Sequence, residues 1–316
     1  MNSPTPVPPT ESANSIAGLA ILGRRRFEDH ASIATRTAGL RLVGYAADGE
    51  AVTVGLAEEV RCHPTPSAAI DDAEVEAVVV NVETDEREYW VKRAAEAGKH
   101  VLCDTPVVPT FSKARCLVSS FEANGLTFAL TDELFYSAIA DRSRKTVSEG
   151  TLGRLLFVDA KVSVPRRWLA PRSAGVMLEY GSSTAVLLQE IIGRLDTAHG
   201  RTRSFGVNRP EEDVAVANLG FVNGVEGILQ VCGLGERSEL EIEIHGSAGS
   251  ATFLQQLPIQ SRDGLARIYE GFSRALRGER PTLDAQVLQD SLFIVDWIQQ
   301  SARLGREISR KEVKLG

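Results

Sequence analysis

The chain has 316 residues, of which 43% are hydrophobic and 24% are charged. These proportions are ordinary for a soluble globular protein, and the length is sufficient for two domains. The formal net charge of −7 argues against an extended nucleic-acid surface, which needs clustered positive charge. The sequence contains no run of about 18 apolar residues, so we expect no membrane span and no membrane partner.

The N-terminal segment and the cysteines indicate the cellular compartment that we expect for this protein. Residues 1–14 are rich in Pro, Ser and Thr and lack the basic start and apolar run of a signal peptide. We expect a disordered tail there and a cytoplasmic protein. The four cysteines have no C-x-x-C spacing and no pairing with the five histidines. They predict reduced, mostly buried thiols and no metal site.

The first half of the chain alternates short apolar runs with helical patterns. Strands are predicted at residues 18–23, 40–47, 77–82, 100–103 and 126–130. Helices are predicted at residues 27–36, 56–61, 86–97 and 111–123. This alternation predicts a Rossmann-like, doubly wound parallel sheet with a ligand crevice at the carboxyl ends of its strands. We assign residues 15–135 to this nucleotide-binding-type domain.

The second half has a different pattern. A helix is predicted at residues 137–149, and two amphipathic helices at residues 265–277 and 284–304. Between them, strands separated by glycines are predicted at residues 155–164, 213–221, 227–232 and 240–245. Their patterning predicts a largely antiparallel open sheet with one covered face. We assign residues 136–316 to a C-terminal α+β domain.

The segment EAGKHVLCDTP, residues 96–106, resembles the A-G-K-H-V-L-x-E-K-P signature of the Gfo/Idh/MocA family, the glucose-fructose oxidoreductase and inositol dehydrogenase relatives. Other segments are similar to family segments in family order, at residues 56–60, 72–80, 149–153, 270–276 and 301–306. The resemblance covers nearly the full length. It implies NAD or NADP as cofactor, and a C-terminal domain that binds substrate and joins subunits. The signature's lysine, which assists proton transfer in that family, is Thr105 here.

The expected phosphate loop reads Gly-Arg-Arg-Arg-Phe-Glu, starting at Gly23. A dinucleotide loop needs glycines because backbone amides must approach the pyrophosphate closely, and only one remains. Arg24 and Arg25 could offer charge to a phosphate, or they could belong to a solvated turn without a cofactor. Asp48 is a candidate ribose ligand or a simple turn residue, and Asn81 is expected to line the crevice. NAD or NADP binding is therefore open.

The family pattern G-G-x-L-x-D-x-G-x-H is similar to residues 174–183. Glu179 stands at its aspartate position and Ser183 at its histidine position, and a serine hydroxyl is a very weak base. The candidate catalytic residues of this altered pocket are Asp104, Thr105, Glu133, Tyr136, Glu179 and Ser183. The candidate substrate ligands are Arg166, Arg167, Trp168 and Tyr180. Glu179 could form an acid–base pair with Glu133 or Tyr136 if burial raises a carboxyl pKa, and each of these residues also has a structural interpretation.

Three functions are open at this point. The first is an enzyme of altered chemistry without the usual Lys/His machinery: a cofactor-free isomerase, lyase or cyclase, or a modified reductase. The second is a non-catalytic homologue that partners an active enzyme. The third is an ordinary NAD(P)-dependent sugar or polyol oxidoreductase. In every case we expect a small-molecule ligand, no nucleic-acid partner, and a homo-oligomer or a hetero-oligomer with a homologue, assembled through the open face of the C-terminal sheet.

Overall fold

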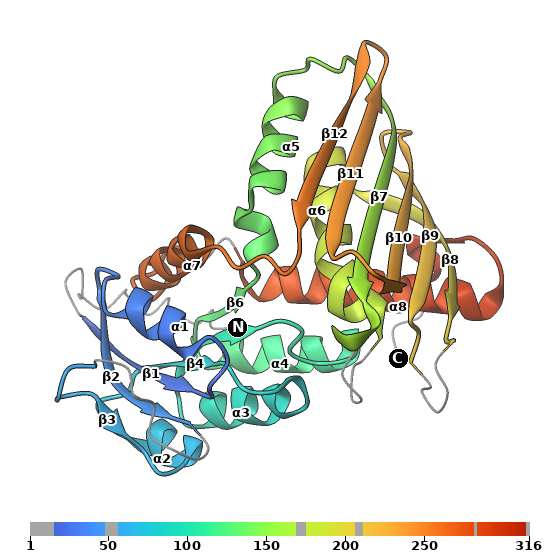
Figure 1. The fold of residues 1–316 in the computed structure, drawn as a ribbon. Coiled ribbons are helices and arrows are strands. Elements are labelled where there is room, and N and C mark those ends of the chain that lie inside the picture. The colour runs from blue at the N-terminus through green and yellow to red at the C-terminus, as the bar shows by residue number, and fades with distance from the viewer. Residues whose placement is uncertain (1–15, 48–55, 169–174, 206–210, 281–282, 314–316) are drawn as a thin grey trace, which may run out of the picture.

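The computed structural model describes residues 16–47, 56–168, 175–205, 211–280 and 283–313. Two β-sheets organise this part of the chain, one formed by the first half and one by the second (Figure 1). The expected tail at residues 1–14 and the candidate ribose ligand Asp48 lie outside the described residues.

The first sheet has six parallel strands in the order β3-β2-β1-β4-β5-β6. They are β1 (Ala17–Leu22), β2 (Leu40–Ala46), β3 (Arg61–Cys62), β4 (Ala77–Val80), β5 (His100–Asp104) and β6 (Phe128–Thr131). Every residue of β1 and β4 is buried, as expected for central strands covered on both faces. The strand order reverses at β1 and β4, which opens a crevice at their carboxyl ends. The predicted Rossmann-like, doubly wound sheet is confirmed.

Four helices accompany these strands: α1 (Phe27–Ala34), α2 (Pro66–Asp71), α3 (Thr84–Glu96) and α4 (Phe111–Ala123). The helix predicted at residues 56–61 was wrong, because this segment contains a turn and then the start of β3. The helix lies a few residues later as α2. It begins after Thr65, whose hydroxyl accepts a hydrogen bond from the backbone N–H of Ala68 at 3.1 Å, with Pro66 at the first helical position.

The second sheet has seven strands in the order β12-β11-β7-β10-β9-β8-β13. They are β7 (Leu155–Pro165), β8 (Leu195–Arg203), β9 (Val214–Phe221), β10 (Glu226–Gly235), β11 (Glu239–Gly246), β12 (Gly249–Gln256) and β13 (Ile308–Ser309). Only the central pair, β7 and β10, is parallel. The predicted largely antiparallel sheet is confirmed, although β8, β12 and β13 were not predicted.

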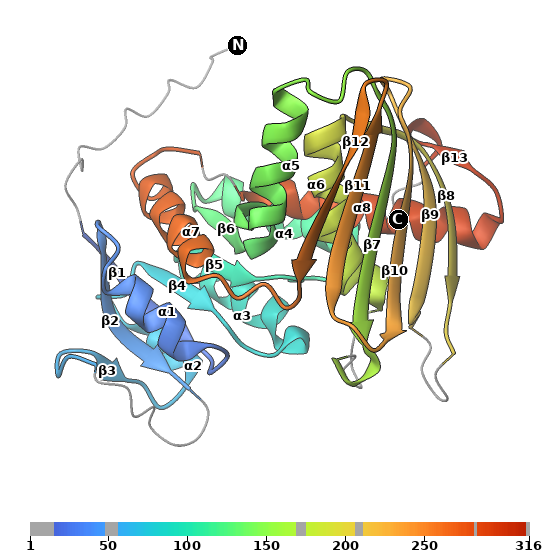
Figure 2. The ribbon, with the colours of Figure 1, turned by 45° about the horizontal axis from the view of Figure 1, so that its top comes forward.

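Helices cover one face of this second sheet. The helices α5 (Ala138–Ser148), α6 (Ser182–Ile192) and α8 (Ala285–Leu304) lie on that side (Figure 1). Along β7, Val158 and Val162 are buried, whereas Asp159 and Lys161, which lie between them in the strand, are more exposed. The opposite face carries no helix of the described chain (Figure 2). Self-association through this face stays a prediction.

The last helix before α8 returns to the first sheet. Helix α7 (Arg262–Ala275) packs against α1 (Figure 1), where the Tyr269 hydroxyl lies 2.8 Å from Nδ1 of His30. A β-bridge between Asp284 and Ala129 of β6 is a second contact between the end of the chain and the N-terminal half. Segments beyond residue 260 therefore pack against the N-terminal sheet and its helix α1.

The cysteines differ in exposure. Cys103 is buried and Cys232 is half-buried, but Cys62 and Cys116 are exposed, and all four are free. The expectation of mostly buried thiols was therefore wrong for half of them. None of the helices in the described chain is long and apolar enough to cross a membrane.

Candidate functional site

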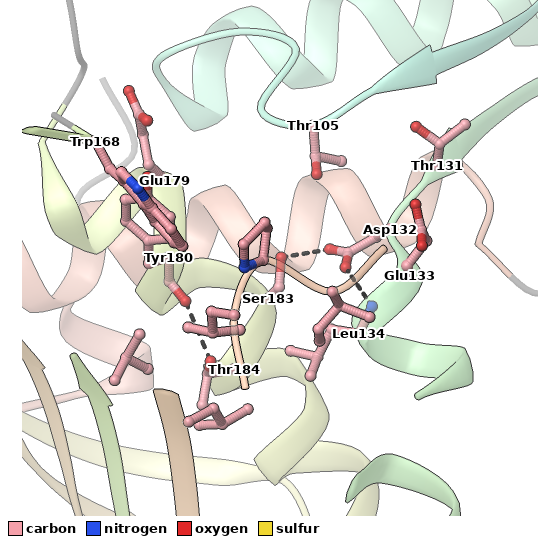
Figure 3. Close-up of a pocket in the computed structure, with 15 residues that line it drawn as sticks. Thr105, Thr131, Asp132, Glu133, Leu134, Trp168, Glu179, Tyr180, Ser183 and Thr184 are labelled. Atoms are coloured by element: carbon pink, nitrogen blue, oxygen red, sulfur yellow. Dashed lines mark hydrogen bonds between the residues drawn. The ribbon is translucent and has the colours of Figure 1, made fainter. Parts of the chain in front are cut away.

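A cavity of about 240 Å³ lies between the carboxyl ends of β5 and β6 and the start of α6 (Figure 3). Its position is the one expected for a ligand bound to a doubly wound sheet. The lining residues are Thr105, Thr131, Asp132, Glu133, Leu134, Val162, Trp168, Glu179, Tyr180, Ser183, Thr184, Leu240, Leu257, Pro258 and Ile259.

One wall of the cavity begins with an irregular helical turn. Residues Met177–Gly181 form a π-helix that continues directly into α6. Such turns inside helices are frequent at functional sites. In Figure 3, Ser183 points toward Asp132, whereas the carboxylate of Glu179 points away from Asp132. Burial and the nearby Glu179 raise the pKa of Tyr180 to about 12, so its hydroxyl keeps its proton.

Asp132 is the central polar residue of the cavity. The Ser183 hydroxyl donates a hydrogen bond to its Oδ2, and the backbone N–H of Leu134 donates to its Oδ1 at 3.1 Å. Burial raises the pKa of Asp132, and these two hydrogen bonds oppose the rise. The Thr105 hydroxyl points toward this pair from the other side of the cavity (Figure 3). A buried carboxyl with a raised pKa beside a hydroxyl is suited to accepting or donating a proton.

Glu133 lines the same cavity but is already paired. Arg26 donates through Nη1 to its Oε1, and the backbone N–H of Ser261 donates to its Oε2 at 2.6 Å. Burial raises the pKa of Glu133, and Arg26 opposes the rise. The two neighbouring carboxyl groups therefore differ, since Glu133 is held by a cation and Asp132 only by neutral donors.

Asp104 ends β5 and lies beside the cavity. Its Oδ1 accepts a hydrogen bond from the Thr131 hydroxyl, and Arg87 Nη2 lies 4.0 Å from its Oδ2. Arg87 is 1% exposed and donates to the backbone carbonyls of Val82, at 3.2 Å, and Pro106, at 3.0 Å. Asp104 and Arg87 thus hold the turn after β5 in place.

The remaining predicted site residues are spread more widely. Tyr136 packs under the Arg267 guanidinium, which lies 4.7 Å from its ring centroid. Arg166 and Arg167 are exposed in a short 3-10 helix, of which only Trp168 lines the cavity. The structure thus brings six candidates together in the cavity: Thr105, Glu133, Trp168, Glu179, Tyr180 and Ser183. Four candidates do not line it: Asp104, Tyr136, Arg166 and Arg167.

Two important residues were missed by the sequence analysis. Asp132 and Thr131 follow the buried run at residues 128–130, at the carboxyl end of β6. Polar residues at such a strand end were the available signal. The segment at residues 257–259, which closes the cavity from beyond β12, carried no local signal of that kind.

The loop after β1 passes very close to the end of β4 at Gly23. Gly23 has a φ of +107°, and a Cβ there would lie 2.2 Å from the backbone oxygen of Asn81. Arg26 is the N-cap residue of α1, and its side chain makes no capping hydrogen bond to the first turn. The first-turn amides are therefore not capped by this side chain and face the crevice end of the helix, where anions bind.

Side chains around this loop supply donors. Arg24 and Arg25 are exposed, and Arg25 Nη1 lies 3.8 Å from the exposed Glu83 carboxylate. Asn81 is fully buried and donates through Nδ2 to the backbone carbonyl of Arg25. Among the described residues, Arg26 Nη2 and Asn81 Oδ1 are buried without a hydrogen-bond partner. The uncapped helix end and the arginines offer donors to an anionic diphosphate, beside two acidic side chains of the first turn, Glu28 and Asp29, of which Asp29 is already paired with Arg26.

Both halves of the chain match models of one protein family. A model described as "Oxidoreductase family, NAD-binding Rossmann fold" matches residues 16–131, and one described as "GFO/IDH/MocA C-terminal domain" matches residues 141–252. The fold is that of an oxidoreductase scaffold built on an NAD-binding Rossmann fold. The chain belongs to the Gfo/Idh/MocA family.

Individual relatives agree with this assignment. The chain is 29% identical over 235 residues to an inositol 2-dehydrogenase of Paracoccus denitrificans, which covers 69% of this chain and 66% of that protein. It is 25% identical over 185 residues to an uncharacterized oxidoreductase, YhhX, of Escherichia coli, which covers 57% of this chain and 53% of that protein. The match thus spans about half the length of that relative.

Solved structures show the same fold over nearly the whole chain. The WlbA dehydrogenase of Bordetella pertussis, solved with NADH and UDP-GlcNAcA, superimposes with a TM-score of 0.80 at 18% identity, covering 97% of this chain and 100% of that one. The scyllo-inositol dehydrogenase of Lactobacillus casei, solved with NAD(H) and scyllo-inositol, gives a TM-score of 0.74 at 15% identity, covering 95% and 100%. At these identities the likeness is one of fold. Within the described ranges, no group of three or more His, Cys, Asp or Glu residues is arranged to hold a metal ion.

Proposed function

We propose that this protein is an NAD(P)-dependent oxidoreductase for a small hydroxylated substrate of the sugar or polyol type, with a rebuilt proton-transfer group. The observation that carries the proposal is the hydrogen bond from Ser183 to the buried carboxyl of Asp132, opposite Thr105. The relatives whose names state an activity include inositol dehydrogenases, and the two similar structures described above hold NADH or NAD(H).

The donors around the β1 loop would hold the cofactor. The first turn of α1 and the side chains of Arg24 and Arg25 would receive its diphosphate. Gly23 lets the loop approach Asn81 closely enough to form this receptor. When bound, the nicotinamide supplies hydride acceptance or donation.

The protein's own part of the chemistry is proton transfer. A substrate hydroxyl between Thr105 and Ser183 gives its proton to Ser183 Oγ, while the Ser183 proton passes to the Asp132 carboxylate. The same substrate carbon loses a hydride, which the nicotinamide, when bound, would accept, so that a carbonyl forms and the charges balance. A pKa of Asp132 raised by burial makes the carboxylate a better base than a solvated aspartate. In the reverse direction the protonated Asp132 returns the proton through Ser183.

This reading changes the roles expected for two glutamates. Glu133 is held by Arg26 and Ser261, and the Glu179 carboxylate points away from Asp132 (Figure 3). An acid–base pair of Glu179 with Glu133 is therefore not favoured by the geometry. The family relatives also favour redox chemistry over a cofactor-free isomerase, lyase or cyclase.

The test is calorimetric titration of the purified protein with NADH and NADPH, followed by turnover of a polyol and sugar panel with NAD+ or NADP+. We expect saturable binding of at least one cofactor and oxidation of at least one panel member. Binding without any turnover would favour the non-catalytic homologue, and no binding of either cofactor would overturn the proposal.

Two glycine variants form a matched control for the loop. Gly23 and Gly125 both have positive φ values, but a Cβ on Gly125 meets nothing within 4 Å. Gly23→Ala should abolish cofactor binding because the loop must move away from Asn81. Gly125→Ala also places an alanine at a positive φ, but without a clash, and it should bind the cofactor normally.

A further inference from the structure

Arg26 connects the cofactor loop to the substrate cavity. It is the only non-glycine residue among those described with a positive φ, at 48°. Its Nε donates to Asp29 at 3.1 Å, and its Nη1 donates to Glu133 in the cavity wall. An L-residue in this conformation is strained and persists where its surroundings require it, often at functional sites. Here the pairing of the Arg26 side chain with Asp29 and Glu133 holds the backbone in this conformation.

The guanidinium of Arg26 is only partly satisfied. Its side chain is 25% exposed, yet Nη2 is buried and has no hydrogen-bond partner among the described residues. The residue is also the N-cap of α1, the end of the helix at which an anion binds. A diphosphate at this helix end would compete with Glu133 for the same guanidinium, because Arg pairs most strongly with phosphate through two parallel N–H groups.

Glu133 depends on Arg26 for its charge. The charged and titratable groups around it are Arg26 from α1, Asp104 from β5 and the adjacent Asp132, with Asp29 and Arg262 beyond Arg26. Only Arg26 pairs directly with the carboxylate, since the other donor is the neutral backbone N–H of Ser261. Without Arg26, a buried carboxylate beside Asp104 would lack a countercharge.

We propose that Arg26 is a switch residue, which pairs with Glu133 before the cofactor binds and transfers to the cofactor's diphosphate afterwards, whereupon Glu133 takes up a proton. This inference rests on the proposed function. The protonated Glu133 then presents an O–H donor to the substrate cavity and removes a negative charge beside Asp132. Cofactor binding thereby prepares the cavity for a hydroxylated substrate, so the cofactor binds first.

The direction of the pH dependence follows from the contacts. Burial raises the pKa of Glu133, while the hydrogen bond and charge of Arg26 lower it. Loss of Arg26 to the diphosphate removes the lowering contributions, so the pKa of Glu133 rises further on binding. At a pH between the pKa of Glu133 in the free protein and its pKa in the complex, the complex holds more protons than the separate protein and cofactor. Cofactor affinity therefore falls as pH rises through this range. The window lies above the pKa of Glu133 in the cofactor-free protein.

The experiment is calorimetric titration of NADH into the full chain in buffers of different ionisation enthalpy, from about pH 6 to about pH 8. NADH is the probe because its diphosphate does not titrate in this range. We expect uptake of a fraction of a proton approaching one per NADH bound, with affinity falling as pH rises. Binding without proton uptake would overturn the switch and leave the proposed function intact, whereas absence of NADH binding would overturn both.

Two variants give opposite affinity changes and separate the switch from general electrostatics. Glu133→Gln removes the competitor for Arg26, so NADH should bind roughly tenfold more tightly and without proton uptake. Arg26→Gln removes the diphosphate ligand, so binding should weaken by roughly tenfold, again without uptake. Equal effects of the two variants on affinity would contradict the proposal.

Asp296→Asn is the matched control. Asp296 is a partly buried carboxyl on α8 whose pKa is also raised by burial, and it accepts one backbone hydrogen bond, from Phe111 at 3.0 Å. It lies outside the set of residues that line the cavity. This variant should keep the proton uptake and the NADH affinity of the unmodified protein. Loss of uptake in Asp296→Asn would assign the titration to a global change and not to Glu133.

Discussion

The interior of the six-stranded sheet and the crevice at its carboxyl ends adjoin each other, but they are held together by different interactions. In β1 and β4 every residue is buried, and all side chains are apolar. In the crevice and directly behind it, Asp132, Glu133 and Arg87 are buried polar residues. Two of them have partners far along the chain: Glu133 pairs with the backbone of Ser261, 128 residues apart, and Asp132 with Ser183, 51 residues apart. The sheet interior is therefore specified by local apolar runs, whereas the crevice depends on pairings that only the complete fold creates.

The largest effect on stability is expected in the sheet interior. Leu19→Ala removes a fully buried side chain of β1 and should lower the free energy of unfolding by about 3–5 kcal/mol. Leu254→Ala is the control, because Leu254 is 48% exposed on β12 and should change it by less than about 0.5 kcal/mol. Urea unfolding measures both. Similar losses in the two variants would contradict the packing assigned to β1.

A smaller loss is expected from the buried charge behind the crevice. Arg87→Leu leaves the carbonyls of Val82 and Pro106 without this donor and Asp104 without its cation. We expect a loss of about 2–3 kcal/mol, below that of a fully buried pair because Asp104 is 20% exposed.

Arg93→Leu on the same helix serves as the control for Arg87→Leu. Arg93 pairs with Asp71, whose side chain is 56% exposed, so this variant should lose at most about 1 kcal/mol. Urea unfolding of the two variants side by side compares a buried with an exposed arginine on α3. An equal loss in both would show that Arg87 stabilises the protein no more than a surface arginine does.

The smallest effect on stability concerns the pH dependence contributed by Asp132. Its pKa is raised in the folded protein, so folding favours its protonated form. The stability that protonated Asp132 contributes is fully present below its unfolded pKa of about 3.9. It is lost as pH rises through the pKa of Asp132 in the folded protein. Asp132→Asn should therefore become more stable relative to the unmodified protein as pH rises from low to neutral. Parallel stability curves for the two proteins would show that Asp132 is not destabilised by burial.

The sequence was sufficient for most of the fold because each apolar run has one plausible structure. The helix predicted at residues 111–123 has the same bounds in the structure, and the central strands agree within one or two residues. Helix α6 was missed because it begins with Ser182, Ser183 and Thr184, which are weak helix formers, after a π-turn. Its existence depends on packing against α8, which no local pattern reveals.

The site was predictable only in part for the same reason. Thr105 and Ser183 were found because they replace residues of a family pattern, and the structure places both in the cavity. Asp132 lies in no such pattern, and its importance comes from its contact with Ser183, 51 residues away. Arg26 was noted only as part of a basic loop, because its pairing with Glu133 joins two segments 107 residues apart.

We propose that Asp132 accepts the substrate proton through Ser183. The direct test is the turnover number of Asp132→Asn with the best substrate of the panel, measured after its NADH affinity has been shown to equal that of the unmodified protein. We predict that turnover falls by about 100- to 10,000-fold, the usual contribution of a general base, while Asp296→Asn keeps full activity. Undiminished turnover in Asp132→Asn would contradict the account.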